Sequence, residues 1–123
     1  MNQSQQLFER ACRCIPGGVN SPVRSFRSVG GNPVYIERGC GSKVYDADGR
    51  EYIDFCGSWG PLLLGHAPAE VVKAVRDAAE KGLSFGACCP SEVEFAELLT
   101  GMMPPDAMIR LVNSGTEAVM TAL

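Results

Sequence analysis

The sequence has 123 residues, enough for one domain of ordinary size. Hydrophobic residues make up 46% and charged residues 20%, a globular composition that argues against disorder. The net charge of −3 excludes the basic field that nucleic-acid binding needs. No apolar run approaches the roughly 20 residues of a membrane span, so we also expect no membrane partner.

Six cysteines raise the question of disulfides or a zinc site. They include no Cys-x-x-Cys pair, and His66 is the only histidine available as a further ligand. We therefore predict no metal site and expect reduced thiols. The polar start, residues 2–6, lacks the layout of a signal peptide. Together these features predict a cytoplasmic protein.

The first predicted element is a helix over residues 3–14, followed by a long loop. Apolar residues recur there at helical spacing, namely Leu7, Phe8, Ala11 and Cys12. Pro16-Gly17-Gly18 ends this helix. Residues 16–32 are rich in glycine, proline, serine and asparagine, which indicates a turn-rich loop. Its length favours a functional loop over a neutral connector.

A small antiparallel β meander is predicted next, with strands over residues 34–36, 43–45 and 51–55. Asp48-Gly49 supplies the turn between the last two strands. The third strand alternates polar and apolar residues, as a half-buried strand does. A glycine-rich loop that contains Trp59 then leads to Gly65-His66.

Two amphipathic helices are predicted over residues 68–81 and 91–102. Gly82 suits the C-terminal cap of the first helix. Ser91 and Glu94 match a capping box at the start of the second.

Residues 108–112 read as a buried strand of a parallel sheet, followed directly by a new helix. One strand and one helix start cannot complete such a sheet. The sequence is therefore predicted to be α/β and incomplete, cut short at Leu123. We expect three parts: a small domain with the substrate loop and β meander over 1–67, a helical connection over 68–107, and the start of a large domain over 108–123.

The junction between this strand and the helix, Asn113-Ser114-Gly115-Thr116-Glu117, is the best candidate for an anion site. A helix start presents unpaired N–H groups, and two hydroxyls and a glycine add donors and room for close approach. The alternative is that Ser114 or Thr116 only caps the helix. The residues alone leave both interpretations open.

Other residues are weaker candidates when taken alone. Arg24 lies in the long loop, where its guanidinium can hold a carboxylate or be solvated at the surface. Trp59 is either a pocket wall or a core anchor, and His66 is best explained as a structural hydrogen-bonding residue. None of the lysines looks like a desolvated amine suited to a Schiff base, namely Lys43, Lys73 and Lys81.

The order of short motifs resembles the N-terminal region of the glutamate-1-semialdehyde 2,1-aminomutase family, within the class III aminotransferase group of fold-type I pyridoxal-phosphate (PLP) enzymes. The resemblance covers the whole chain but about a quarter to a third of a family member. It rests on Pro16-Gly17-Gly18-Val19-Asn20-Ser21-Pro22-Val23-Arg24, Asp46-Ala47-Asp48-Gly49, Tyr52-Ile53-Asp54-Phe55, Trp59-Gly60-Pro61, Gly65-His66, Ser84-Phe85-Gly86-Ala87 and Asn113-Ser114-Gly115-Thr116-Glu117-Ala118.

This resemblance implies a PLP-dependent isomerase that converts glutamate-1-semialdehyde, a small amino-aldehyde, to 5-aminolevulinate for tetrapyrrole synthesis. It implies that Ser114, Gly115 and Thr116 hold the cofactor phosphate. It further implies that Ser21 and Arg24 bind the substrate carboxylate and that Trp59 lines the substrate pocket. The family works as a homodimer.

The family's Schiff-base lysine has no counterpart in this chain, so we expect the chain alone to be inactive and to carry no catalytic residue. Two alternatives are another class III aminotransferase acting on a different amine and a noncatalytic binding or assembly module. The long Arg24 loop argues against the first, and the abrupt end in a helix argues against the second.

Overall fold

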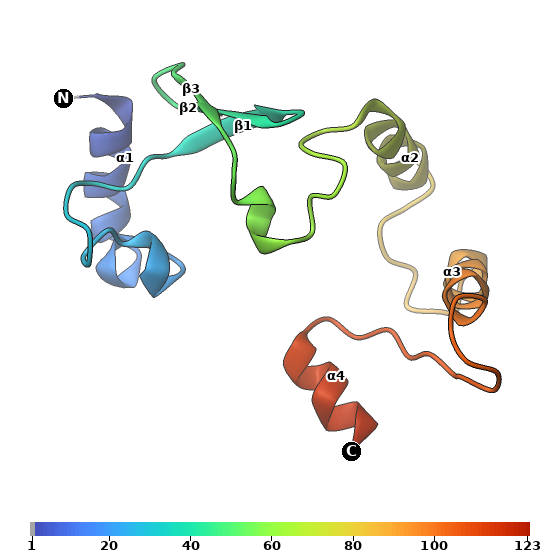
Figure 1. The fold of residues 1–123 in the computed structure, drawn as a ribbon. Helices are drawn as coiled ribbons and strands as arrows, with labels where there is room; N and C mark the ends of the chain where they lie inside the picture. The colour runs from blue at the N-terminus through green and yellow to red at the C-terminus, as the bar shows by residue number, and fades with distance from the viewer. Residues whose placement is uncertain (1) are drawn as a thin grey trace. The chain divides into compact units, whose positions relative to one another are not determined.

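The computed structural model describes residues 2–123, which divide into two compact units at Ala78/Ala79 (Figure 1). The first unit opens with helix α1, Gln3–Cys12. Asn2 caps it: its side chain accepts from the Gln5 amide at 2.9 Å, and the Gln5 side chain accepts from the Asn2 amide at 3.1 Å. The helix ends two residues before the predicted end, because the Cys14 and Ile15 amides turn back to the Ala11 carbonyl.

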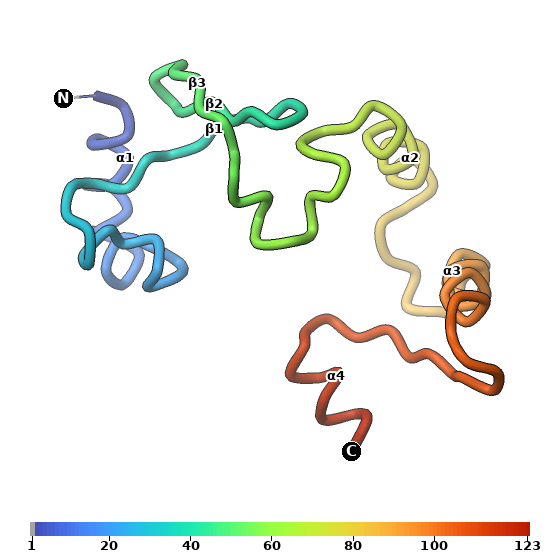
Figure 2. Tube along the Cα trace, in the orientation of Figure 1, coloured from blue at the N-terminus to red at the C-terminus, as the bar shows by residue number. Residues whose placement is uncertain are grey.

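The loop after α1 contains two short 3-10 turns, η1 (Pro16–Gly18) and η2 (Pro22–Arg24), as Figure 2 traces. Gly18 has a φ of +74°, and a Cβ there would lie 2.6 Å from Phe8 Cε2 and 2.8 Å from Cys12 Sγ. Only glycine therefore lets the loop pass so close to α1. This contact fixes where the segment that carries Arg24 begins.

The predicted antiparallel meander is confirmed, with strands β1 (Ile36–Cys40), β2 (Lys43–Asp46) and β3 (Glu51–Ile53) in that order. The first strand lies later than the predicted 34–36, because its pairing with β2 runs from Ile36 to Cys40 around a tight turn. The third is shorter than predicted. It ends at Ile53 because the Asp54 carboxylate accepts hydrogen bonds from the Cys56 and Gly57 amides, which starts a turn.

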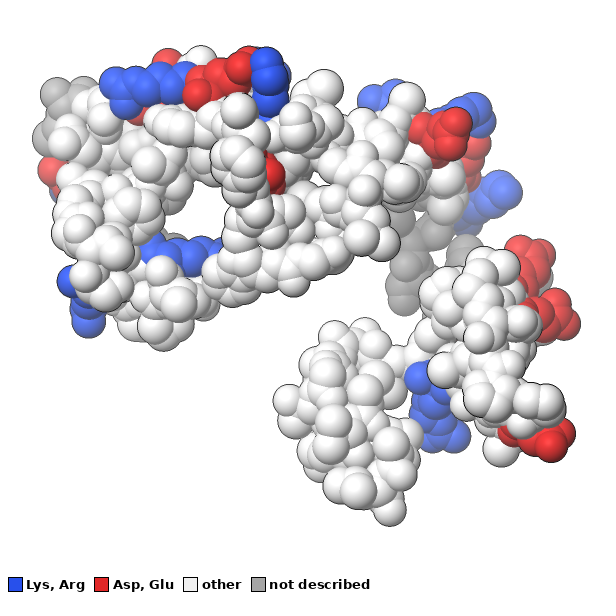
Figure 3. Space-filling model, viewed as in Figure 1, with Lys and Arg blue, Asp and Glu red and all other residues white. Residues whose placement is uncertain are grey.

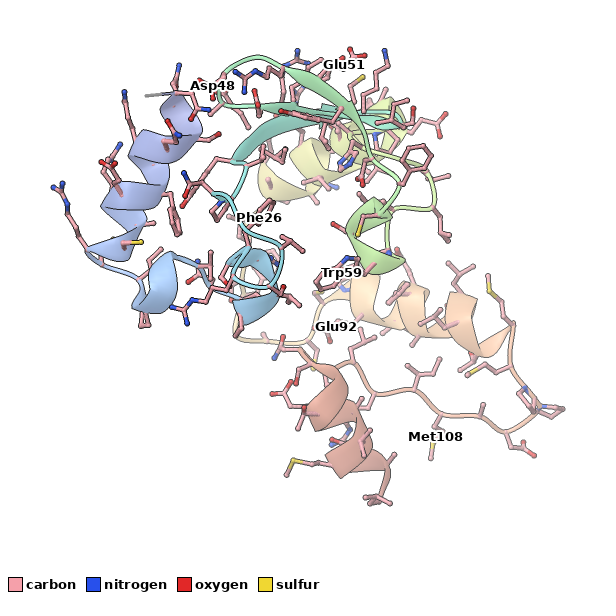
Figure 4. The ribbon with its side chains drawn as sticks, turned by 60° about the vertical axis from the view of Figure 1, so that its left-hand side comes forward. Phe26, Asp48, Glu51, Trp59, Glu92 and Met108 are labelled. Carbon is pink, nitrogen blue, oxygen red and sulfur yellow. The ribbon has the colours of Figure 1, made fainter. Side chains whose placement is uncertain are left out.

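Two aspartates of the β2–β3 turn tie the sheet together and hold α1 on it. Asp46 is 1% exposed and accepts from the Asp48 and Arg50 amides at 3.0 and 2.8 Å and from the Tyr52 hydroxyl at 2.8 Å. Burial alone would raise the pKa of Asp46, but these hydrogen bonds outweigh it and lower that pKa. Asp48 accepts from the Gln3 amide at 2.7 Å, at the N-terminal end of α1 (Figure 4).

Helix α2, Ala69–Ala79, crosses the boundary between the units, and α3, Pro90–Thr100, lies in the second. Gly82 closes α2 as predicted, with a φ of +118° and its amide on the Ala79 carbonyl. The predicted capping box at Ser91 is wrong. Pro90, with its fixed φ, takes the first helical position and makes Cys89 the N-cap, so the Ser91 hydroxyl meets Cys89 Sγ at 3.0 Å.

Residues 108–112 do not form the predicted strand in the structure of residues 2–123. The segment lies outside regular secondary structure and has no ladder partner among the described residues, and a strand exists only where a neighbour completes its hydrogen bonds. Helix α4, Gly115–Ala122, follows at the predicted place. No described helix is long and apolar enough to cross a membrane.

Little of the described chain is buried. Ala11 is its one buried hydrophobic residue, and Ser4 and Asp46 are its buried polar residues. Large apolar side chains are correspondingly exposed, including Phe55 (94%), Leu63 (91%) and Met108 (96%). Residues 2–123 therefore have hydrogen-bonded local structure without a hydrophobic core.

We expect the isolated 123-residue chain to unfold over a broad range of temperature, because apolar burial supplies most of the cooperativity of folding. Circular dichroism during heating, with sedimentation to confirm a monomer, tests this. A sharp calorimetric transition in the monomer would contradict it; a sharp transition in an oligomer would not, since association would supply the missing burial.

Candidate functional site

A cleft of about 740 Å³ in the first unit is the main candidate site. Figure 3 shows the molecular surface hollowed between the N-terminal helical segments and the sheet. Its walls come from α1, the long loop, the sheet and the segment that follows β3. The residues that line it include Arg24, Phe26, Asp54, Trp59 and His66.

Arg24 ends the η2 turn and lines this cleft. Its amide donates to the Ser21 carbonyl at 2.9 Å, so Ser21 supports the turn but does not itself line the cleft. Within residues 2–123, ion pairs join Lys43 to Glu51 and Lys73 to Asp77, His66 is hydrogen-bonded to Asp54, and none of these pairs involves Arg24. Its guanidinium is thus available to a carboxylate from outside the described chain.

Trp59 also lines the cleft and is 70% exposed, which excludes the core-anchor interpretation for the described chain. It comes from the 3-10 turn η3, Gly57–Trp59, while Phe26 comes from the loop after η2 (Figure 4). The backbone at Trp59 has a φ of +64°, a left-handed conformation that few non-glycine residues adopt. The structure therefore brings Arg24 and Trp59 to one cleft.

Asp54 and His66 form a hydrogen-bonded pair in the same cleft. His66 Nε2 lies 2.6 Å from Asp54 Oδ2, and Asp54 Oδ1 accepts from the Cys56 and Gly57 amides at 2.8 and 3.0 Å. The bond from His66, with those two amide bonds, holds the pKa of Asp54 below its ordinary value. The structural role expected for His66 is confirmed. The sequence alone predicts no role for Asp54, although the residue lies in the Tyr52-Ile53-Asp54-Phe55 motif.

The strand–helix junction lies in the second unit, where Ser114 is the N-cap of α4. Its hydroxyl accepts from the Glu117 amide at 3.3 Å and lies 3.1 Å from Glu117 Oε2, which also accepts from the Asn113 amide at 2.9 Å. The Gly115 and Thr116 amides have no hydrogen-bond partner within residues 2–123. Ser114 therefore caps the helix, and two first-turn donors beside it are available to an anion.

The lysines offer no Schiff-base site within the described chain. Hydrogen bonding to Glu51 raises the pKa of Lys43, which keeps its amine protonated and unreactive. Lys73 bonds to Asp77 at 2.5 Å on an exposed face of α2, and Lys81 is exposed.

A family model described as "Aminotransferase class-III" matches residues 26–123. The chain belongs to the class III aminotransferase family. Among curated relatives, the glutamate-1-semialdehyde 2,1-aminomutase of Bordetella avium is 62% identical over the whole chain, and that of Dechloromonas aromatica is 58% identical over 99% of it. The chain spans 29% of the length of each relative.

Solved transaminases share the fold. An omega-transaminase from Sphaerobacter thermophilus matches 98% of this chain with a TM-score of 0.87 and 39% identity, over 27% of its own length. A structure titled "Transaminase with PLP bound" matches 97% of the chain with a TM-score of 0.86 and 43% identity, also over 27%. The predicted fold class, an incomplete fold-type I PLP-dependent transferase, is confirmed, and so is the resemblance to the aminomutases.

The pair of Asp54 and His66 predicts a pH dependence in this class III chain. Because folding lowers the pKa of Asp54, the stability that its hydrogen bonds contribute is present above the ordinary carboxyl pKa of about 3.9 and is lost as pH falls through the lowered value. NMR of His66, the only histidine, should show an acid transition with its midpoint below that value. Asp54→Asn should abolish this transition and Asp77→Asn should leave it unchanged; a midpoint at or above the ordinary value would contradict the assignment.

Proposed function

We propose that this chain is the N-terminal part of a PLP-dependent aminomutase that converts glutamate-1-semialdehyde to 5-aminolevulinate. The observation that carries the proposal is that relatives 55–62% identical over 98–100% of the chain are all named glutamate-1-semialdehyde 2,1-aminomutase. The cleft with Arg24 and Trp59 supports it, because this substrate combines a carboxylate with a small polar carbon chain.

In this proposal Arg24 holds the substrate carboxylate with two parallel hydrogen bonds, and Ser21 contributes through the η2 turn that presents Arg24. The Trp59 indole contacts the carbon chain of the substrate and excludes water from that side. No described carboxylate pairs with Arg24, so the substrate does not have to displace an internal partner. Fixing one end of the substrate in this way orients its reacting carbons.

The junction at the start of α4 fits the phosphate of PLP. The first-turn amides of Gly115 and Thr116 are unbonded within residues 2–123, and apart from its chain neighbours and the backbone of its own helix no described atom lies within 4 Å of the position that a Gly115 Cβ would take. Ser114, Gly115 and Thr116 would hold the phosphate, and the bound cofactor would supply the carbonyl and electron sink for moving amino groups. The Glu117 carboxylate beside this corner holds Ser114 and the Asn113 amide.

A homodimer and a cytoplasmic location complete the proposal. The exposed apolar surface of the described chain is in keeping with burial against further protein. The six free cysteines fit a reducing compartment.

A chimera tests the activity. Residues 1–123 would replace the aligned segment of the Bordetella avium relative, and 5-aminolevulinate formation would be measured without an added keto acid. We expect turnover, and Arg24→Ala should raise KM on the order of 10- to 100-fold through loss of charge-assisted hydrogen bonds. Arg27→Ala, in the same loop but not lining the cleft, is the matched control. Activity only with a keto acid would favour an ordinary aminotransferase.

The phosphate corner is tested by cofactor affinity. In the chimera, the double variant Ser114→Ala, Thr116→Ala should weaken PLP binding on the order of 10-fold, measured by absorbance during dialysis. Thr121→Ala in the same helix, whose hydroxyl bonds to the Glu117 carbonyl at 2.7 Å, is the control. Equal cofactor retention by both variants would place the phosphate elsewhere.

A further inference from the structure

We propose that Asp54 is a positioning residue that fixes Trp59 in the cleft, an inference that rests on the proposed function of Trp59 as a substrate wall. Asp54 directly follows β3 and does not need to touch substrate to act. Its Oδ1 accepts from the Cys56 and Gly57 amides at 2.8 and 3.0 Å, at the entrance to η3. The carboxylate thus holds the first residues of the turn that carries the indole.

The turn needs such a restraint, because its backbone is left-handed over four consecutive residues. The φ angles are +52° at Gly57, +53° at Ser58, +64° at Trp59 and +123° at Gly60. Glycine accepts this conformation, but serine and tryptophan adopt it only when their surroundings enforce it. The Trp59 amide bonds to the Cys56 carbonyl at 2.9 Å, so the Asp54-bound end of the turn also fixes the backbone of Trp59.

Asp54 is itself held from a second side by His66. The His66 ring lies 2.6 Å from Asp54 Oδ2, and the His66 backbone exchanges two hydrogen bonds with Gly41, at 2.8 and 2.9 Å. The ring packs against Gly39, where a Cβ would lie 2.5 Å from the imidazole Cγ. The carboxylate is therefore anchored to the sheet through His66 while its other oxygen holds the η3 turn.

A chain of hydrogen bonds through His66 and Asp54 thus connects the sheet to the turn that carries Trp59, the proposed wall of the substrate site. Asp54, His66 and Trp59 line one cleft, and Arg24 faces the same space. Releasing the turn would let residues 57–60 relax and move the indole from its place in the cleft that Arg24 also lines. We expect loss of Asp54 to act on substrate binding through Trp59, and the two residues to behave as one unit.

A double-mutant cycle in the chimera tests this. Asp54→Ala and Trp59→Ala should each raise KM for glutamate-1-semialdehyde on the order of 10-fold, with a smaller effect on kcat. The double variant should be no worse than Trp59→Ala alone, because residues that act through one another are not additive. Asp54→Asn, which keeps an oxygen for the two amides, should restore KM to within about 2-fold of the parent. Glu51→Gln on β3, exposed and outside the cleft, is the matched control.

Each outcome decides between the inference and the proposed function. If Trp59→Ala raises KM but Asp54→Ala does not, or if the two effects multiply, the positioning role is wrong and the proposed function stands. If Trp59→Ala leaves KM unchanged in an active chimera, the substrate wall and the positioning role both fail. A folded chimera without turnover contradicts the proposed function and the inference with it. Should Asp54→Ala not fold, Asp54→Ser takes its place in the cycle, with the thermal midpoint measured for every variant.

Discussion

Hydrogen bonds that backbone amides donate to aspartate carboxylates hold the first unit in shape. With Ala11 as the one buried hydrophobic residue described, apolar packing cannot do so. Asp46 accepts from amides of the β2–β3 turn, Asp48 accepts from the first amide of α1, and Asp54 accepts from amides at the start of η3. An ionised carboxylate accepts several N–H bonds at once, so each aspartate orders a segment that has little other support. The cleft lies among the segments that they fix.

Local sequence patterns predict most of the helices and turns. The features that they do not predict depend on contacts between residues far apart in the sequence. The helices and the Asp48-Gly49 turn can be predicted from the sequence because each depends on residues close together in the chain. A strand is predicted over 108–112 but does not form among the described residues, because a strand needs a partner that apolar composition does not specify. The role of Asp54 depends on His66, twelve residues later, and on a left-handed turn. Only the family resemblance suggests substrate-binding roles for Arg24 and Trp59, because their spacing in the sequence is compatible with other roles.

The two groups of candidate residues lie in different units of the chain. The groups proposed to recognise substrate, Arg24 and Trp59, belong to the first unit, and the Gly115 and Thr116 amides, which are proposed to bind phosphate, belong to the second. Each group is ordered by its own local hydrogen bonds: η2 and η3 in one case, the Ser114 cap in the other. On the proposed function, substrate selectivity and cofactor affinity therefore depend on separate sets of hydrogen bonds in this chain.

The close approach at Gly18 has a bearing on enzyme engineering. A Cβ at that position would lie 2.6 Å from Phe8 Cε2 and 2.8 Å from Cys12 Sγ, so any other residue there would force those side chains of α1 to shift. Phe26, further along the same loop, has a φ of +58°, a backbone conformation that few non-glycine residues adopt. Val23 lines the cleft without a positive φ, so on the proposed function it is the position of this loop to diversify while the glycine is kept.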